Sequence, residues 1–144
     1  MRLYLAHPLD TREKVRSVEL QLEKKLKISL INPFYDVERH DIVEIDAGRK
    51  ERYENLDFVS LVEHDLAMVK ACDGVLAYIS EGAFSVGTIC EAWWCATITG
   101  KPVYFVSEHH HQHPWVRFMA YCSKGKLFRT FEEFGEFVKT HVKR

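Results

Sequence analysis

Short apolar runs alternate with longer amphipathic stretches along the whole chain. Four runs rich in Leu, Ile, Val and aromatic residues have the length and composition of buried strands, and a weaker fifth lies at Leu127 and Phe128. The four strong runs cover residues 2–6, 28–32, 74–79 and 103–106. Residues 34–55 are polar, and we expect a loop with a short helix there.

The amphipathic stretches between these runs predict helices, because their apolar residues recur at three- and four-residue spacing. The predicted helices cover the stretch that carries Val15, Val18, Leu22 and Leu26, residues 56–71, 88–99 and 115–121, and the segment after Thr130. Asp10 with Glu13, and Thr130 with Glu133, have the spacing of capping pairs at helix starts. Gly100, followed by Pro102, predicts the end of the helix over 88–99.

Strands separated by helices predict βαβ units and a doubly wound α/β fold, with a sheet of four or five mainly parallel strands flanked by helices. No repeat, low-complexity tract or linker interrupts the chain, so we expect a single domain over residues 1–144. Sheets of this kind bind ligands beyond the carboxyl ends of their strands. The loops expected at those ends are residues 7–12, 33–40, 80–88 and 107–114.

Composition and charge narrow the function classes. Hydrophobic residues make up 47% of the 144 residues, which is enough for a packed core. Lys and Arg number 20 against 21 Asp and Glu, so the chain lacks the basic field typical of a nucleic-acid-binding protein. No apolar run has membrane-spanning length, and the first residues resemble a strand rather than a signal peptide. We therefore expect a cytoplasmic protein with no membrane or nucleic-acid partner.

Cysteine and histidine, two common metal ligands, do not form a recognisable metal motif here. The cysteines form no CxxC pair, which favours reduced thiols in the core; they are Cys72, Cys90, Cys95 and Cys122. Four histidines lie between His109 and His113 without acids or cysteines at ligand spacing. We interpret this cluster as a loop at the crevice mouth, with a metal site as the alternative, and expect no metal or organic cofactor.

The segment from Ser85 to Glu91 links a predicted strand to a predicted helix at the expected crevice. Gly87 lets the backbone approach a ligand closely, and Ser85 and Thr88 add hydroxyl groups. Free N–H groups in the first turn of a helix, together with the helix dipole, favour an anion. The segment can therefore hold a phosphate or a sugar oxygen, although loops with Gly, Ser and Thr are common in α/β proteins.

Glu91 falls in the first turn of the predicted helix and has two interpretations. An acid at this position commonly complements the helix dipole, which is worth under about 1 kcal/mol. However, Glu91 is a lone acid beside Trp93 and Trp94 in a largely apolar helix. A retaining glycosyl transfer needs a carboxylate on one face of the anomeric carbon, and Glu91 can supply it.

Asp65 and the loop aromatics also have two interpretations each. Asp65 interrupts an apolar helix, and the pattern alone favours a solvated face shared with Glu63 over a role in catalysis. The aromatic residues in or near loops can stack on a base or pack in the core; they are Phe34, Tyr35, Trp115 and Tyr121.

Three motifs, in order and spacing, resemble the nucleoside 2-deoxyribosyltransferase superfamily, which includes the 2′-deoxynucleoside 5′-monophosphate N-hydrolases and related nucleotide N-glycosidases. The opening YLAHPL, from Tyr4 to Leu9, resembles the family's YLAGP. Residues 63–77 resemble its DL…aDgvvA segment, and residues 85–103 resemble its GT..E…GKPV segment. The resemblance covers most of the chain. It implies a flavodoxin-like fold and a homodimer or higher homo-oligomer with sites near subunit interfaces.

The resemblance also implies roles for individual side chains. Glu91 matches the catalytic nucleophile, and Asp65 matches the acid that orients the substrate and helps the base to leave. Tyr4 matches a tyrosine that hydrogen-bonds near the nucleophile. Ser85 matches the serine with which the monophosphate hydrolases bind phosphate, where the transferases tend to have an acid. An acid would repel a phosphate, whereas a hydroxyl at a helix N-terminus binds one.

Three other positions fit the hydrolase branch less closely. His7 replaces the family's usual glycine, where it can fill part of the sugar or phosphate site or add positive charge near a phosphate. Arg12 is a loose positional match to a phosphate-binding arginine. Ser123 lies on a segment from which a serine of the hydrolases reaches a neighbouring subunit's site.

These residues predict an N-glycosidase that hydrolyses the base–sugar bond of a (2′-deoxy)nucleoside 5′-monophosphate. The phosphate is expected at Ser85 and Gly87, at the start of the helix. The base is expected toward Phe34, Tyr35 and Asp65. One alternative is a nucleoside 2-deoxyribosyltransferase that exchanges bases between deoxynucleosides. The other is a nucleotide-binding module without catalytic activity.

Overall fold

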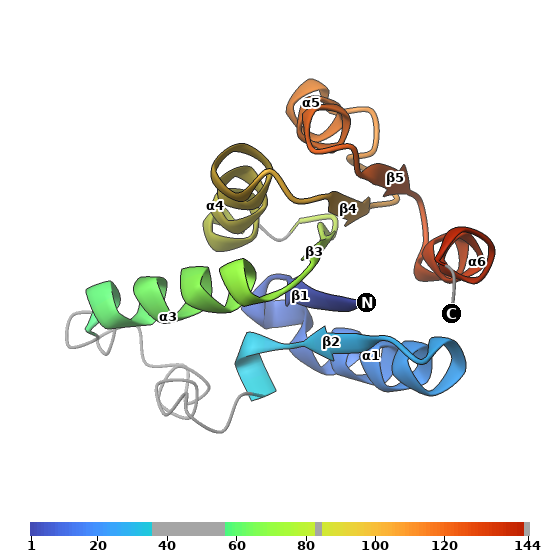
Figure 1. Cartoon of the computed structure of the whole chain (residues 1–144), viewed down its shortest axis with the longest axis horizontal. Coiled ribbons are helices and arrows are strands. Elements are labelled where there is room, and N and C mark those ends of the chain that lie inside the picture. The colour runs from blue at the N-terminus through green and yellow to red at the C-terminus, as the bar shows by residue number, and fades with distance from the viewer. Residues whose placement is uncertain (36–56, 83–84, 143–144) are drawn as a thin grey trace.

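Five parallel strands form one sheet at the centre of the protein (Figure 1). The computed structural model describes residues 1–35, 57–82 and 85–142. The strands lie in the order β2-β1-β3-β4-β5, and they are β1 (Arg2–Ala6), β2 (Ser29–Ile31), β3 (Gly74–Tyr78), β4 (Val103–Val106) and β5 (Lys126–Phe128). The predicted doubly wound α/β fold is confirmed, and the weak pattern at residues 127–128 does form an edge strand.

Helices cover both faces of the sheet (Figure 1). The helices are α1 (Arg12–Leu26), α3 (Phe58–Ala71), α4 (Val86–Trp94), α5 (Pro114–Cys122) and α6 (Phe131–His141). Helices α1 and α6 lie on one face, and α3, α4 and α5 lie on the other. Short 3-10 turns precede α1 at Leu9–Thr11 and follow β2 at Pro33–Tyr35, and α4 runs into a π-helical turn over Cys95–Thr99.

Alternation along the strands divides the core into two layers. In β1, Leu3 and Leu5 point toward α1 and α6, whereas Tyr4 and Ala6 point toward the opposite helices. All four are at most 1% exposed, as expected for a parallel strand covered on both faces. Tyr4 therefore places its ring under α4, which is the helix that carries Glu91.

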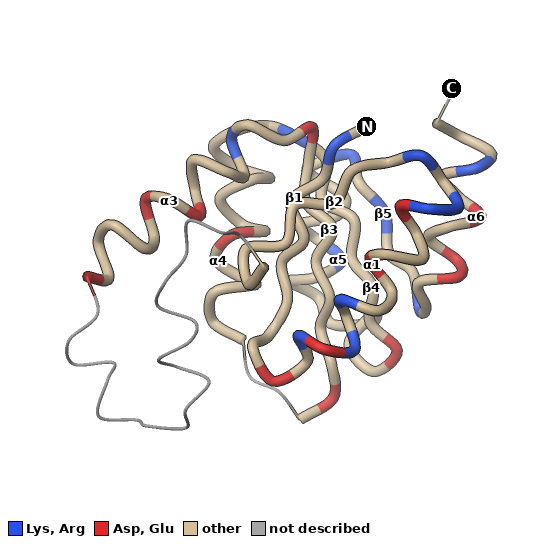
Figure 2. The backbone as a smooth tube through the Cα atoms, turned by 90° about the horizontal axis from the view of Figure 1, so that it is seen from below, with Lys and Arg blue, Asp and Glu red and all other residues tan. Residues whose placement is uncertain are grey.

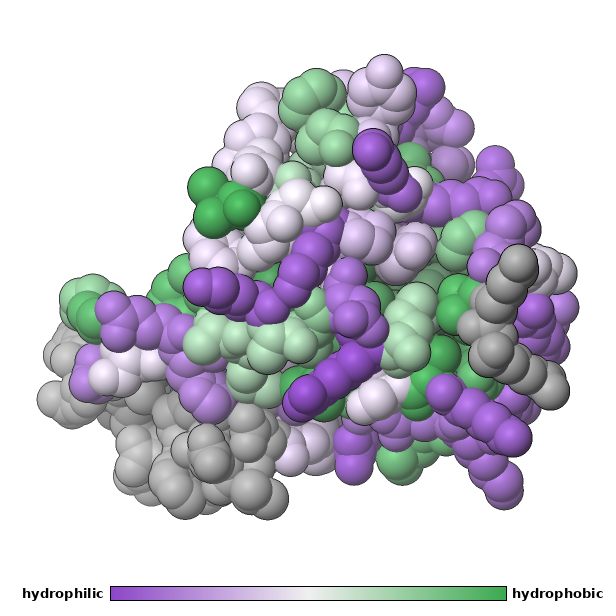
Figure 3. All heavy atoms as spheres, in the orientation of Figure 1, coloured by the Kyte–Doolittle hydropathy of each residue, from purple (hydrophilic) through white to green (hydrophobic). Residues whose placement is uncertain are grey.

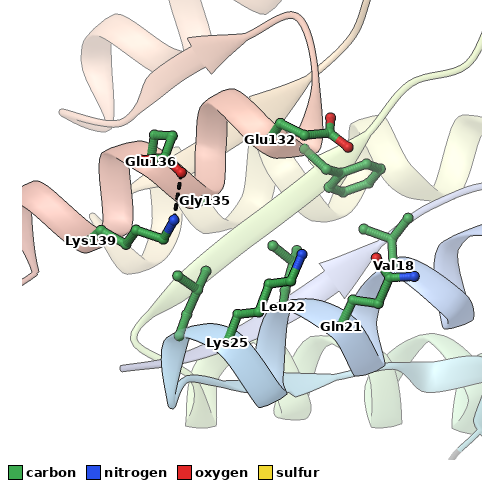
Figure 4. Close-up of a pocket in the computed structure, with 10 residues that line it drawn as sticks. Val18, Gln21, Leu22, Lys25, Glu132, Gly135, Glu136 and Lys139 are labelled. Atoms are coloured by element: carbon green, nitrogen blue, oxygen red, sulfur yellow. Dashed lines mark hydrogen bonds and ion pairs between the residues drawn. The ribbon is translucent and has the colours of Figure 1, made fainter.

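Helices α1 and α6 pack along a seam that contains a small hollow of about 110 Å³ (Figure 4). Gly135 lies at the closest approach, where an added Cβ would meet the Leu22 side chain at 3.6 Å. Charged residues border the seam, and Lys139 pairs with Glu136 at 2.6 Å. We regard this hollow as a packing seam between two amphipathic helices.

Charged residues of both signs are distributed along the chain rather than gathered on one side (Figure 2). Polar and apolar residues are likewise interspersed on the face seen in Figure 3. Within the described residues, no helix has the length and apolar character needed to cross a membrane.

Two predicted helix starts differ from the structure. The N-cap of α1 is Thr11, without a side-chain capping bond, so the Asp10–Glu13 capping pair was wrong. Helix α4 begins at Val86 rather than Thr88, because Ser85 caps it by accepting a hydrogen bond from the Thr88 N–H. The Thr130–Glu133 pair is confirmed at α6: Thr130 accepts from the Glu133 N–H at 3.2 Å.

Helix α3 is less buried than its apolar pattern suggests. Of its predicted apolar side only Val69 is fully buried, whereas Phe58 is 72% exposed and Val62 is 52% exposed. Figure 1 shows the reason: the N-terminal half of α3 extends beyond the edge of the sheet, so only its C-terminal half packs on strands. The projecting half nevertheless brings Leu61 and Asp65 beside the carboxyl edge of the sheet, at the cleft described next.

Candidate active site

A cleft of about 610 Å³ opens at the carboxyl edge of the sheet. The loops after β1 and β2, one side of α3 and the start of α4 form its walls. It brings together most of the predicted site residues from distant parts of the chain; these are His7, Phe34, Asp65, Ser85, Gly87, Thr88 and Glu91. The position is the one at which doubly wound sheets bind ligands, next to the strand β1 where the chain order reverses.

Glu91 lies in this cleft and is held by Tyr4. The Tyr4 hydroxyl donates to Glu91 Oε1 at 2.8 Å, across 87 positions of sequence. Tyr4 is fully buried, so its ring cannot move without disturbing the core, and it fixes the direction of the carboxylate. Because α4 begins at Val86, Glu91 lies in the second turn of the helix and not in the first, which weakens the interpretation of Glu91 as a helix-dipole residue.

The start of α4 forms the other part of this wall. Ser85 accepts from the Thr88 N–H at 3.2 Å, and the Ser85 hydroxyl also bonds to Thr88 Oγ1. Thr88 is buried, whereas Val86 and Gly87 are exposed at the cleft. The first N–H groups of a helix have no partner within the helix, so Val86 and Gly87 present donors to whatever occupies this end of the cleft.

Asp65 lines the cleft from α3, which packs beside the helix of Glu91. Asp57 caps α3 by accepting from the Ser60 N–H at 3.0 Å, which fixes where the helix starts. Asp65 is half-buried, whereas Glu63 on the same helix is exposed and does not line the cleft. The two acids therefore do not share one solvated face.

His7 and Phe34 form the end of the cleft furthest from α4. His7 follows β1 and is 4% exposed, and Phe34 follows β2. Their rings meet edge to face with centroids 4.8 Å apart. Burial lowers the pKa of the His7 imidazole from its usual value, and its hydrogen bonds to Asn32 and to the Pro8 carbonyl act in the opposite direction.

Besides Tyr4, which reaches Glu91 from the core, three predicted site residues lie outside the cleft lining. Tyr35 is 42% exposed and stacks beneath the Arg16 guanidinium, 4.8 Å from its ring centroid. Arg12 begins α1 and donates to the Leu9 carbonyl at 3.4 Å. Ser123 is 3% exposed; its hydroxyl accepts from the Val103 N–H at 3.0 Å and donates to the Ala120 carbonyl at 3.2 Å. Ser123 thus joins α5 to β4, and we leave it out of the proposed site.

The histidine-rich loop lies beside a different hollow at the edge of the sheet. His109 lines that hollow and approaches Glu81 at 3.2 Å, and His113 caps α5 by accepting from the Trp115 N–H at 3.3 Å. Across residues 1–35, 57–82 and 85–142, no group of three or more potential metal ligands comes together. None of the histidines from 109 to 113 lines the cleft that contains Glu91.

Two buried polar residues behind the cleft were missed at the level of sequence. Glu19 is 2% exposed and Asn32 is 5% exposed, and they connect to His7 through hydrogen bonds. A signal for Glu19 was present, because it lies four residues after Val15 and three before Leu22, on the apolar side of its helix. A charged residue on that side must find a buried partner.

The fold and the cleft define a class: a doubly wound α/β protein with a carboxylate, held by a buried tyrosine, in a cleft at the carboxyl edge of its sheet. No protein-family model and no curated protein matches the chain. Among solved structures, a CMP N-glycosidase from Clostridium botulinum, BcmB, is similar, with a TM-score of 0.58 and 16% sequence identity. The match covers 99% of this chain and 100% of that one, so the two proteins share their whole fold.

Proposed function

We propose that this protein is an N-glycosidase that hydrolyses the base–sugar bond of a nucleoside or 2′-deoxynucleoside 5′-monophosphate. The observation that carries the proposal is the Glu91 carboxylate, held by the buried Tyr4 hydroxyl in a cleft that also contains Asp65 and a helix N-terminus. The similar protein from C. botulinum is named as an enzyme that acts on CMP, which is a substrate of this class.

The cleft offers three positions in the order of the strands. The start of α4 follows β3 and offers N–H donors for a phosphate. Glu91 lies above β1, where the sugar would bind, since Tyr4 of β1 contacts it. The loop after β2 carries Phe34, whose ring suits a base. A nucleotide bound in this direction would place its anomeric carbon at Glu91.

The reaction follows from these positions. Glu91 attacks the anomeric carbon as the bond to the base nitrogen breaks, and the electron pair of that bond leaves with the base. Asp65, as the acid, donates a proton to the departing base. Water then attacks the anomeric carbon of the glycosyl–enzyme ester and gives a proton back to Asp65, which releases the sugar phosphate and regenerates the Glu91 carboxylate with net retention at the anomeric carbon. Tyr4 keeps the carboxylate aimed throughout.

Base exchange is the alternative reaction, because a second base can take the glycosyl group in place of water. Purified protein is incubated with nucleosides and with their 5′-monophosphates, with and without added adenine or cytosine, and the products are separated by chromatography. Hydrolysis predicts free base and sugar phosphate from monophosphates at a rate that the added base does not change. New nucleosides that form only with added base would instead establish a transferase, and they would contradict the expected role of Ser85 in binding a phosphate.

Ser85→Asp tests the phosphate position. Asp is as good an N-cap as Ser, so α4 should keep its start, while the new carboxylate repels a phosphate. We expect kcat/KM for monophosphates to fall about 100-fold, roughly 2.7 kcal/mol, with a smaller loss for free nucleosides. Thr130→Asp makes the same exchange at the N-cap of α6 and should leave both activities unchanged. Equal losses for nucleosides and monophosphates in Ser85→Asp would contradict a phosphate site here.

We also propose a homo-oligomer, because an aromatic surface lies on α4 and α5. Trp93 is 40% exposed, Trp115 is 60% exposed and Phe118 is 52% exposed. The ring of Trp93 packs against the other two: its centroid lies 5.8 Å from that of Trp115 and 6.5 Å from that of Phe118. A contiguous group of exposed aromatic side chains is typical of protein interfaces.

Sedimentation velocity tests this surface. We expect the protein to sediment as a dimer or larger species, and Trp115→Glu to shift it toward the monomer by placing a charge in the interface. Leu20→Glu is the matched control, since Leu20 is 51% exposed on α1, a helix of the other face. A monomeric parent protein, or an equal effect of both variants, would contradict the proposed interface.

A further inference from the structure

A buried chain of hydrogen bonds connects α1 to the wall of the cleft. The Asn32 amide donates to Glu19 Oε2 at 2.7 Å, and Asn32 Oδ1 accepts from His7 Nε2 at 3.0 Å. Arg16 pairs with the other oxygen of Glu19. The mechanism above uses neither Glu19 nor Asn32, although both are at least 95% buried. Buried polar groups of this kind are costly unless fully bonded, so their retention calls for a reason.

The chemistry of the partners fixes the direction of the bonds that join Glu19, Asn32 and His7 Nε2. A carboxylate without a proton only accepts, so the NH₂ group of Asn32 must face Glu19. Asn32 Oδ1 then faces both the Phe34 N–H, at 3.2 Å, and His7 Nε2, which must be the donor. His7 Nδ1 lies 3.1 Å from the Pro8 carbonyl oxygen, which only accepts, so this contact is a hydrogen bond only when Nδ1 also carries a proton. Asn32 therefore keeps a proton on His7 Nε2 and fixes the position of the Phe34 backbone.

His7 and Phe34 are the two aromatic rings of the cleft at the end away from α4. Both nitrogens of the His7 ring face protein oxygens, so the ring acts as a wall and not as a proton donor to a ligand. Burial raises the pKa of Glu19, and the bonds from Asn32 and Arg16 oppose that shift. The hydrogen bonds of the network thus offset the cost of burying Glu19, and they also hold the rings of His7 and Phe34 in place.

We propose that Glu19 and Asn32 are positioning residues that hold the His7–Phe34 pair as the wall against which the base of the nucleotide lies. The proposal rests on the proposed function, since it assigns the base to this end of the cleft. It separates two parts of one ligand: loss of the network should weaken recognition of the base and leave recognition of the sugar phosphate intact.

Binding measurements on matched variants test the proposal. Glu19→Leu and Asn32→Leu remove the network, whereas Glu19→Gln keeps an acceptor for the Asn32 amide. Glu23→Leu is the control, because Glu23 also joins α1 to β2, through the Leu30 N–H at 2.7 Å, without contacting His7. Each change is made together with Glu91→Gln, so that bound nucleotide is not consumed, and thermal melting shows whether each variant folds.

Calorimetry then compares ribo- and deoxyribonucleoside 5′-monophosphates with ribose 5-phosphate and deoxyribose 5-phosphate. We expect both leucine variants at 19 and 32 to bind nucleotides about tenfold more weakly, with less than about a twofold change for the sugar phosphates. Glu19→Gln and Glu23→Leu should stay within about twofold of the parent for both ligands. Phe34→Ala, which removes one ring of the wall without opening the buried network, should reproduce the selective loss.

Two results would overturn the inference. Equal weakening of nucleotides and sugar phosphates would mean that the network only supports the fold, and unchanged nucleotide binding would mean that the wall does not meet the base. If the Glu91→Gln parent binds no monophosphate and no sugar phosphate at all, the proposed function itself fails.

Discussion

Glu91→Gln is expected to reduce release of base from nucleoside 5′-monophosphates by roughly 10³-fold to 10⁶-fold, the range typical of removing a catalytic nucleophile. The amide that replaces the carboxylate has nearly the same shape and keeps an oxygen for the Tyr4 hydroxyl. It cannot form a stable ester with the sugar, so the first step stops. Rates of base release from matched amounts of the two proteins give the ratio directly.

The same variant should fold normally. The bond between Tyr4 and residue 91 becomes neutral, which changes stability by about 1 kcal/mol or less, a few degrees in melting temperature. Glu81→Gln serves as the control, since Glu81 is exposed after β3 and does not line the cleft. Activity of Glu91→Gln within about tenfold of the parent would show that this carboxylate is not the nucleophile.

Asp65→Asn should lower kcat by about 10²-fold to 10⁴-fold, the usual contribution of a general acid. Asp65 lines the same cleft as Glu91 from the neighbouring helix α3, and the proposal assigns it to the departing base. Glu63→Gln on the same helix is the matched control, because Glu63 is exposed and lies outside the cleft lining.

Substrates with different leaving groups can separate a role of Asp65 in departure of the base from a role in substrate binding. A nucleotide with an N7-methylated purine already carries a positive charge on its base, so it needs little help from an acid to depart. We expect Asp65→Asn to lose activity with ordinary nucleotides but to retain most of it with the methylated one. An equal loss with both substrates would assign Asp65 to substrate binding and not to departure of the base.

The sequence was sufficient for the layers of the fold. Strand β1 shows why. Leu3 and Leu5 pack in one core layer and Tyr4 and Ala6 in the other, because a strand that is covered on both faces is apolar at every position. Helices between such strands leave few possible topologies. Prediction from the sequence was less accurate for the residues at which helices begin. Ser85 and Thr88 both carry a hydroxyl, and only the backbone geometry decides that Ser85 is the cap of α4.

Residues of the cleft were predictable where a motif and a strand end coincide. His7 follows β1, Ser85 caps α4 and Glu91 lies in the second turn of that helix, all within recognisable segments, and the fold brings the three to one cleft. Ser123 also fell in such a segment, but its hydroxyl is used inside the chain. Local sequence does not show which partners a buried hydroxyl will find, because Val103 is 20 positions away.

The hydrogen-bonded pair of Glu19 and Asn32 could not be predicted from the sequence for a different reason. The position of Glu19 on the apolar side of its helix shows that it needs a buried partner but not which one, and Asn32 in the sequence is only a residue before a proline. Their hydrogen bond joins α1 to the end of β2, so it exists only once β2 has paired with β1 and α1 has packed on the sheet. Tertiary contact, and not local pattern, brings these two side chains together and connects them to His7.

The most direct test of the central claim is the stereochemistry of transfer to methanol. Enzyme and nucleoside 5′-monophosphate react in dilute methanol, and NMR assigns the anomer of the methyl glycoside 5-phosphate, which does not interconvert as the free sugar does. A covalent ester at Glu91 predicts two inversions and therefore a methyl glycoside of the same β configuration as the nucleotide. The α anomer, or no release of base from any nucleoside 5′-monophosphate, would contradict the account.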